Sequence, residues 1–131
     1  MGTITNICAW PIRKFTLKEA NDELPLLKRV FERHEVACNK ALADQRFYIK
    51  AKAPEALVRQ CDDRVSKEMA ACGKKLLKLG VKPFGSGFVG FDSGCFYWSW
   101  RHGESIVEYY HDYEVHPISG RRKITILTPV K

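Results

Sequence analysis

The chain has 131 residues, of which 45% are hydrophobic and 28% charged, as in a globular domain and unlike a disordered chain. It has no apolar run of the roughly 20 residues that cross a bilayer, and no basic segment followed by an apolar stretch opens it, so we expect a cytoplasmic protein without a membrane span. The net charge of +7 is dispersed, with one tight cluster at Arg121, Arg122 and Lys123, so charge alone predicts only weak, non-specific, salt-dependent binding of nucleic acid.

The first helical signal is the stretch FTLKEANDELPLL. Thr16 and Glu19 have the spacing of a capping box, in which each side chain accepts a hydrogen bond from the other residue's backbone amide. Pro25 lacks an amide hydrogen and disfavours helical geometry in the residue before it. We therefore predict a short first helix, a joint at Asn21–Glu23 and a second helix that begins at Pro25.

Two long helices are predicted next. Residues 25–48 and residues 54–79 carry apolar side chains at three- and four-residue spacing, and Gly80 is a suitable stop for the second helix. Each helix is about 36 Å long, and their short connection predicts an antiparallel hairpin. The remaining chain is too short to cover so long a hairpin, which predicts a homodimer through the helices.

After Gly80 the hydrophobic period changes to two. The segments GFVGFD, CFYWSWR, IVEYYHDY and KITILTP are rich in aromatic and β-branched residues and are separated by turn-like sequences. They predict a four-stranded antiparallel meander over residues 81–131. Together with a helical part over residues 15–80, this gives a single α+β domain of residues 1–131.

The stretch GSGFVG at residues 85–90 has the spacing of a dinucleotide-binding loop. A helix precedes it and a strand follows it, the reverse of the order that such a loop requires, so no cofactor is expected. If Ser93-Gly94 is a two-residue turn, Gly90 lies opposite Tyr97 and Gly87 opposite Trp100. The glycines would then leave room for aromatic rings across bare backbone.

A second hairpin is expected to turn at residues 102–105, which assigns side chains to two faces. An apolar face against the helices would carry Phe96, Trp98, Trp100, Val107, Tyr109 and His111. A polar face would carry Tyr97, Ser99, Arg101, Ile106, Glu108 and Tyr110.

The sequence contains no specific catalytic or metal-binding pattern. His111 and Asp112 are neighbours on a strand and should face opposite ways, and no H-x-x-x-H or H-E-x-x-H pattern occurs. The five cysteines are odd in number and form no C-x-x-C pair, so free thiols are expected. We therefore expect no metal and lean against an enzyme.

Short motifs between residues 15 and 121 resemble the uncharacterised bacterial family known as domain of unknown function 2203. The opening FTLKEANDELPLL is similar to the family's F-T-L-x-E-A-N-x-x-L-P-L-L, and GFVGF is similar to G-L-V-D-F. The remaining matches are Gly80 and Val81 to G-V, Tyr97, Trp100, Gly103 and Glu104 to Y-L-C-W-x-x-G-E, Tyr109 and His111 to Y-W-H, and Gly120 and Arg121 to G-R. The chain departs from the family at Gly90 (Asp in the family) and at Ser99 (Cys in the family). The resemblance implies no activity, but it points to the second hairpin as the place of a site.

The function that the sequence favours is a cytoplasmic binding or regulatory protein that recognises a small polar or anionic ligand or a protein partner. Arg101 and Arg121 are expected to hold an anion, with Tyr110 stacking or hydrogen-bonding and Glu104 and His111 orienting the ligand. The full set of expected ligand residues is Trp100, Arg101, Glu104, Tyr110, His111 and Arg121.

Two alternatives remain open. One is a nucleic-acid-binding protein that uses the basic surface, which an exposed tryptophan face would favour. The other is a small enzyme with His111 and Glu104 as acid and base, which their convergence in one pocket would favour.

Overall fold

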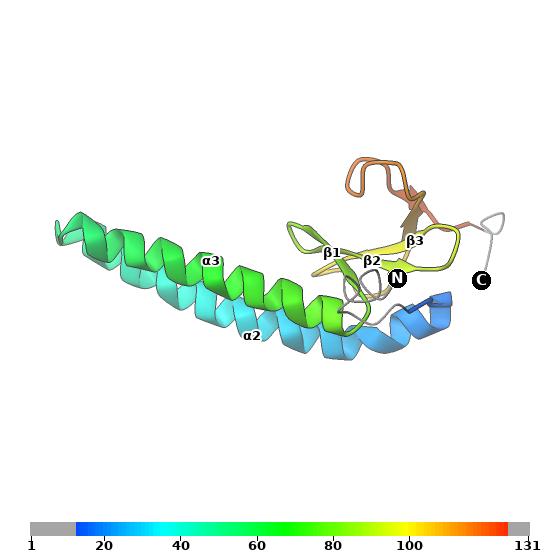
Figure 1. The fold of residues 1–131 in the computed structure, drawn as a ribbon, viewed down its shortest axis with the longest axis horizontal. Helices are drawn as coiled ribbons and strands as arrows, with labels where there is room; N and C mark the ends of the chain where they lie inside the picture. The colour runs from blue at the N-terminus through cyan, green and yellow to red at the C-terminus, as the bar shows by residue number, and fades with distance from the viewer. Residues whose placement is uncertain (1–12, 126–131) are drawn as a thin grey trace, which may run out of the picture. The chain divides into compact units, whose positions relative to one another are not determined.

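The computed structural model describes residues 13–125, which form two long helices followed by an antiparallel sheet (Figure 1). The helices are α2 (Leu17–Lys50) and α3 (Glu55–Lys78), and the strands are β1 (Lys82–Gly85), β2 (Phe88–Asp92), β3 (Tyr97–Arg101), β4 (Tyr109–His111) and β5 (Arg122–Lys123). The α+β class is confirmed, with five strands in place of the four expected. The described residues form two compact units, a sheet unit (residues 13–28 and 76–125) and a hairpin unit (residues 29–75).

The predicted capping box begins α2. The Glu19 amide donates to Thr16 Oγ1 at 3.1 Å, and the Thr16 amide donates to Glu19 Oε1 at 2.9 Å. Two amides that the helix itself leaves without partners are thereby satisfied, which fixes the start of α2 at Leu17.

Pro25 lies inside α2, so the predicted joint at Asn21–Glu23 is wrong. Proline in a helix interior removes one backbone hydrogen bond and crowds the preceding turn, at a cost of about 3 kcal/mol. Ala20, Leu24 and Leu27 lie on the same helix and are at most 3% exposed. Burial of the two leucines alone is worth about 3–6 kcal/mol, which offsets the cost of the proline.

The predicted antiparallel hairpin of α2 and α3 is confirmed, and the two helices run side by side in Figure 1. Side chains cross between them within the hairpin unit: His34 Nδ1 lies 2.7 Å from Glu68 Oε1, and Arg64 donates to Asp44 Oδ2 at 3.0 Å. The predicted stop at Gly80 is also confirmed. Its φ of +83° lets the Val81 amide donate back to the Leu76 carbonyl at 3.0 Å.

GSGFVG is the turn of the β1–β2 hairpin and the start of β2. Gly85 pairs with Phe88, and the two residues between them, Ser86 and Gly87, have φ of +53° and +82°. Two successive positive φ values are the mark of the tight turn that suits a right-twisted hairpin. The strand β1 itself was not predicted. Of the expected strand KITILTP, Lys123 lies in β5 and residues 126–129 lie outside the described residues.

The register between β2 and β3 differs from the predicted one by two residues. Val89 pairs with Trp100, Gly90 with Ser99 and Phe91 with Trp98, so neither Gly90–Tyr97 nor Gly87–Trp100 is a pair. The turn is longer than expected, because Ser93 Oγ accepts from the Cys95 and Phe96 amides and holds residues 93–96 in a loop. A shift of two residues keeps every side chain of β2 on its predicted face.

The register between β3 and β4 differs by one residue, which reverses the faces of β4. Ser99 pairs with Tyr109 and Tyr97 with His111. Tyr109 and His111 therefore share a face with Ser99, and Tyr110 shares the face of Trp98, opposite to the prediction. The slip arises because Val107 leaves the sheet: its side chain is buried, and its amide donates to Asn21 Oδ1 of α2 at 2.9 Å.

The core of the sheet unit lies under the tryptophan face. Trp98 and Trp100 are fully buried, as are Val89 and Phe91 on β2. Trp98 Nε1 donates to the Phe15 carbonyl at 2.9 Å, and the rings of Phe15 and Phe91 meet edge to face at 5.1 Å. The segment that precedes α2 and the sheet are thus joined by aromatic packing and by a buried hydrogen bond that fixes the orientation of an indole.

Candidate functional site

The most polar cluster of the sheet unit surrounds the guanidinium of Arg121. Its Nη2 donates to Glu104 Oε1 at 2.7 Å, and its Nε donates to Ser99 Oγ at 2.8 Å. The charged carbon lies 4.1 Å from the Tyr109 ring centroid and 5.1 Å from that of Phe88. The Arg121 side chain is 12% exposed and that of Glu104 is 24% exposed, so this is a largely buried ion pair between two rings.

Glu104 is held from several sides by the turn that follows β3. The Arg101 amide donates to Glu104 Oε1 at 2.8 Å, and the Glu104 amide donates to the Arg101 carbonyl at 2.9 Å. Trp100 Nε1 donates to the Glu104 carbonyl at 2.9 Å. Gly103 permits this tight turn with a φ of +111°. The carboxylate therefore closes the turn and anchors Arg121 at the same time.

The structure brings together only part of the expected ligand site. Glu104 and Arg121 are in direct contact, and the exposed guanidinium of Arg101 lies over the Phe88 ring at 5.2 Å. Trp100 is a core residue, and Tyr110 packs on the opposite face against Phe96, with ring centroids 5.3 Å apart. Glu104 and His111 share no hydrogen bond within residues 13–125.

His111 lies buried on the same face as Ser99 and Tyr109 and is 1% exposed. Its ring meets those of Phe84 and Tyr97 with centroids 5.4 Å away. Nδ1 lies 3.0 Å from the Asp112 carbonyl, whereas Nε2 has no partner among residues 13–125. Burial lowers the pKa of His111, and the positive charge of Arg121 acts in the same direction, against the opposing effect of Asp112.

The lowered pKa of His111 predicts a loss of stability in mild acid. Below about pH 6.5 the unfolded chain protonates this imidazole while the folded chain keeps it neutral, so the unfolded state binds more protons and the free energy of unfolding falls as the pH falls. Urea unfolding followed between about pH 5 and pH 7.5 checks this. His111→Gln should show a smaller slope in this range than the wild type, and equal slopes would contradict the assignment.

Other features of the described residues give little support for a small-ligand or metal site. One shallow cavity of about 190 Å³ is lined by Lys14, Phe15, Thr16, Glu19 and Ser93, none of which belongs to the expected ligand set. Within residues 13–125 no group of three or more His, Cys, Asp or Glu side chains is placed to hold a metal ion. The thiols of Cys38, Cys61, Cys72 and Cys95 are free, and burial raises the pKa of Cys38 and of Cys72.

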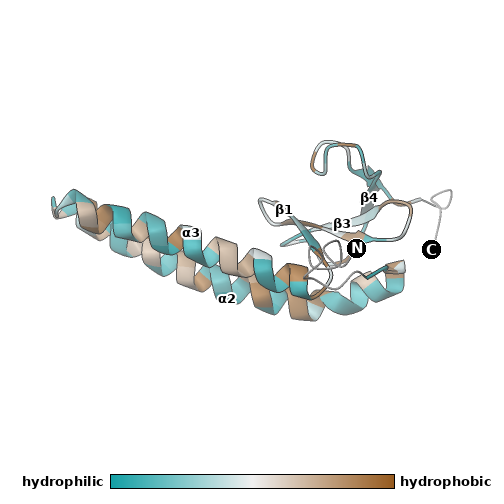
Figure 2. Cartoon of the chain, in the orientation of Figure 1, coloured by the Kyte–Doolittle hydropathy of each residue, from teal (hydrophilic) through white to brown (hydrophobic). Residues whose placement is uncertain are grey.

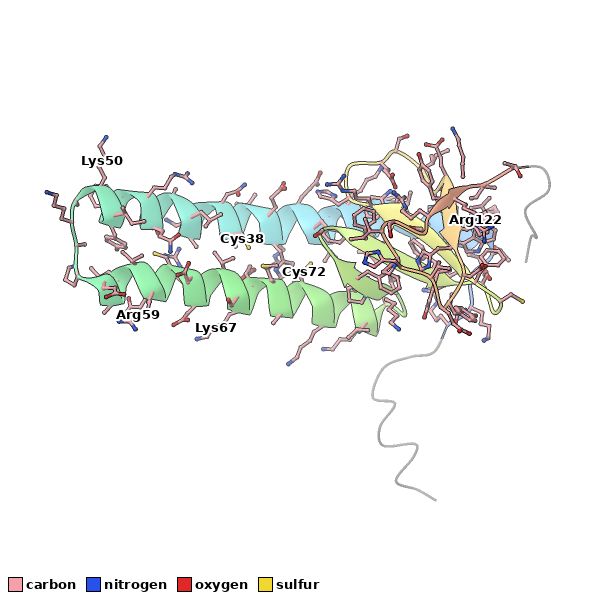
Figure 3. The ribbon with its side chains drawn as sticks, turned by 90° about the horizontal axis from the view of Figure 1, so that it is seen from above. Cys38, Lys50, Arg59, Lys67, Cys72 and Arg122 are labelled. Carbon is pink, nitrogen blue, oxygen red and sulfur yellow. The ribbon has the colours of Figure 1, made fainter. Side chains whose placement is uncertain are left out.

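A second candidate surface is the far end of the hairpin, which we call the hairpin tip: Phe47, Lys50, Lys52 and Arg59. Phe47 is 68% exposed. Between residues 45 and 61 the sequence contains four cations and one carboxylate, Glu55, which lies 4.0 Å from Arg59. Lys50 and Lys52 have no ion-pair partner among the described residues, and Figure 3 shows Lys50 and Arg59 at the end of the hairpin.

The hydropathy of the two helices is mixed along their whole length, as Figure 2 shows by the alternation of polar and apolar bands on α2 and α3. Neither helix is long and apolar enough to cross a membrane.

Sequence reasoning missed the tip and the partners of Arg121. The sequence predicts no role for Phe88 and Ser99, because their contacts with Arg121 depend on how three strands pair with one another. The tip carries a local signal, since a run with four cations and one carboxylate can be read from the sequence alone.

Comparison with known families agrees with the resemblance seen in the motifs. The profile of a family described as "Uncharacterized conserved protein (DUF2203)" matches residues 13–124. No curated protein and no solved structure matches the chain. The family match covers most of the chain and includes α2, α3 and the sheet, and the chain therefore belongs to the DUF2203 family.

Proposed function

We propose that this protein is a cytoplasmic binding module that docks its hairpin tip on an acidic surface of another protein. The observation that carries the proposal is the exposed ring of Phe47 beside Lys50 and Lys52, two cations without an ion-pair partner among the described residues. Aromatic side chains are enriched at the centre of protein interfaces, and complementary charge at the rim speeds association and selects the partner. An apolar pocket surrounded by carboxylates fits both features.

A small anionic ligand at Arg121 is supported less well than a protein partner. Such a ligand would compete with Glu104, whose carboxylate already accepts from Arg121 Nη2 and from the Arg101 amide. Removing this partner would leave a buried carboxylate without its counter-charge, at a cost of several kcal/mol that the new anion would need to exceed.

Nucleic acid would be attracted by the same cations, but an aromatic platform for its bases finds less support. Trp98 and Trp100 are 0% exposed and belong to the core of the sheet unit. Phe47 is a single ring, whereas proteins that hold single strands stack successive bases on several rings.

Site-specific photo-crosslinking tests the proposal. A benzophenone side chain at position 47 should form an adduct with a protein in cells that carry the natural chain. Position 36 is the matched control, because Val36 lies on the same face of α2 and is 69% exposed, against 68% for Phe47. The adduct should form at position 47 and not at position 36, and a protease but not a nuclease should remove it.

Charge reversal at the tip should abolish the adduct. Lys50→Glu with Lys52→Glu removes the attraction to an acidic rim, and a loss of at least tenfold in adduct yield is expected. Lys67→Glu with Lys74→Glu makes the same change of charge on α3 away from the tip and should leave the yield within about twofold. Equal losses in the two double variants, equal yields at positions 36 and 47, or a nuclease-sensitive adduct would refute the proposal.

A further inference from the structure

One side of the hairpin unit presents a broad apolar face. On α2 it carries Leu42 and Ile49, seven residues apart and hence on one side of the helix. On α3 it carries Val58, Val65 and Met69, at spacings of seven and four. Ile49 is 58% exposed and Met69 is 63% exposed, and the other three side chains are half-buried. We call this set the apolar face.

On the other side of the hairpin, charged side chains and not apolar ones connect the two helices. Asp44 and Arg64 meet there at 3.0 Å, and Lys40 adds its charge 3.9 Å from the same carboxylate. In an antiparallel helix pair, the residue one position after a contact residue lies on the same side of the pair in both helices. The residue one position before a contact residue lies on the other side. Leu42 follows Ala41 and Asp62 follows Cys61, and both Ala41 and Cys61 are buried between the helices. The apolar face therefore shares its side of the hairpin with Asp62, whose Oδ1 accepts from Gln45 Nε2 at 2.7 Å, and it is the side on which Ile49 and Met69 stay exposed.

The charges beside the apolar face indicate what covers it. Glu35 lies seven residues before Leu42, where the apolar row on α2 ends, and Arg46 lies on the same side of α2 three turns after Glu35. Both side chains are exposed, and neither has an ion-pair partner within residues 13–125. A lone Glu35 and a lone Arg46 on one edge are complementary to the same edge of a second copy that runs antiparallel.

We propose that a second copy of the chain packs its apolar face on this one, with the two α2 helices antiparallel and Glu35 of each copy beside Arg46 of the other. A two-fold axis between these residues makes the pairing reciprocal, so one favourable pair becomes two. A parallel arrangement would place like charges together. Two helical segments of about 20 residues present a face of roughly 30 by 20 Å, or about 1,200 Å² for the two copies, which is the lower end of specific interfaces.

The mass of the full chain in solution tests the proposal. Light scattering should give twice the 15.0 kDa of the monomer at high micromolar concentration. Met69→Glu places a charge on the apolar face and should give a monomer. Val36→Glu is the control, because Val36 lies on the opposite side of α2 with an exposure of 69%, close to the 63% of Met69, and it should leave the dimer intact. Thermal melts confirm that both variants fold, as the exposure of both positions leads us to expect.

A charge swap tests the arrangement of the copies. Glu35→Arg alone and Arg46→Glu alone each place like charges together twice, and each should raise the dissociation constant of the dimer at least tenfold. The double variant Glu35→Arg with Arg46→Glu restores opposite charges and should recover the wild-type constant to within about threefold. A monomeric wild type, an effect of Val36→Glu equal to that of Met69→Glu, or a double variant no better than the single ones would overturn the proposal.

Discussion

Gly90→Ala is expected to lower the free energy of unfolding by about 1–3 kcal/mol, the range for overpacked core sites. A methyl group at this position would lie 2.6 Å from Phe84 Cε2 and 3.0 Å from Tyr97 Cδ1, closer than van der Waals contact allows. The two rings meet edge to face across the bare backbone with their centroids 5.4 Å apart. Thermal or urea unfolding of the variant measures the loss.

The same experiment decides between two roles for GSGFVG. A loop that cradled a phosphate would lose binding and keep its stability when Gly90 became Ala. Packing against the rings predicts the reverse, together with a partial rescue: Phe84→Ala removes the nearest contact, so the double variant with Gly90→Ala should be more stable than the sum of the two single losses predicts. Strict additivity, or an unchanged melt for Gly90→Ala, would refute the packing role.

Arg121→Met is expected to destabilise the chain by about 2–4 kcal/mol, since it leaves Glu104 partly buried without its counter-charge and Ser99 Oγ without its donor. The substitution also removes the cation from above the rings of Phe88 and Tyr109, so the loss includes these cation–π contacts. Arg121→Lys should recover little, because a single ammonium cannot reach Ser99 and Glu104 in the way that the planar guanidinium does.

The neighbouring Arg122 provides the control for this prediction. It forms an ion pair with Asp112 at 2.9 Å, nearly the 2.7 Å of the Arg121–Glu104 pair, but its side chain is 59% exposed and that of Asp112 is 54% exposed. Exposed pairs contribute little, so Arg122→Met should cost less than about 1 kcal/mol. Double-mutant cycles should give a coupling energy above about 1 kcal/mol for Arg121 with Glu104→Gln, and one near zero for Arg122 with Asp112→Asn. Equal losses for the two arginines would contradict the role of burial.

The helical part of the fold could be predicted because its signals are local. The capping box at Thr16, the stop at Gly80 and the long apolar stripes each depend on residues within a few turns of one another. The one helical error, the break at Pro25, came from a local rule applied where distant contacts decide. The cost of Pro25 follows from its place inside the helix. The burial of Leu24 and Leu27, which offsets that cost, depends on contacts within the sheet unit.

The sheet could be predicted in kind but not in register, because register depends on single side chains in the turns. The hydrogen bonds to Ser93 lengthen one turn by two residues, which leaves the predicted faces of β2 unchanged. The hydrogen bond to Asn21 holds Val107 outside the next strand, which reverses the faces of β4. That reversal divided the expected ligand residues between two faces, with His111 moving to the side of Ser99 and Tyr110 to the side of Trp98. The pair of Arg121 and Ser99 spans 22 residues and follows only from the correct register.

The burial of the described tryptophans gives the two units separate optical signatures. Trp98 and Trp100 are shielded from water in the sheet unit, and the sequence of residues 29–75 contains no tryptophan. The indole emission of this pair should therefore lie at short wavelength and move to the red when the sheet unit opens, whereas far-ultraviolet circular dichroism is dominated by α2 and α3. Recording both signals through one urea titration follows the unfolding of the sheet unit and of the helices without an added label. Coincident midpoints mean a single cooperative transition, and an earlier dichroic midpoint means that the hairpin melts while the tryptophans are still enclosed.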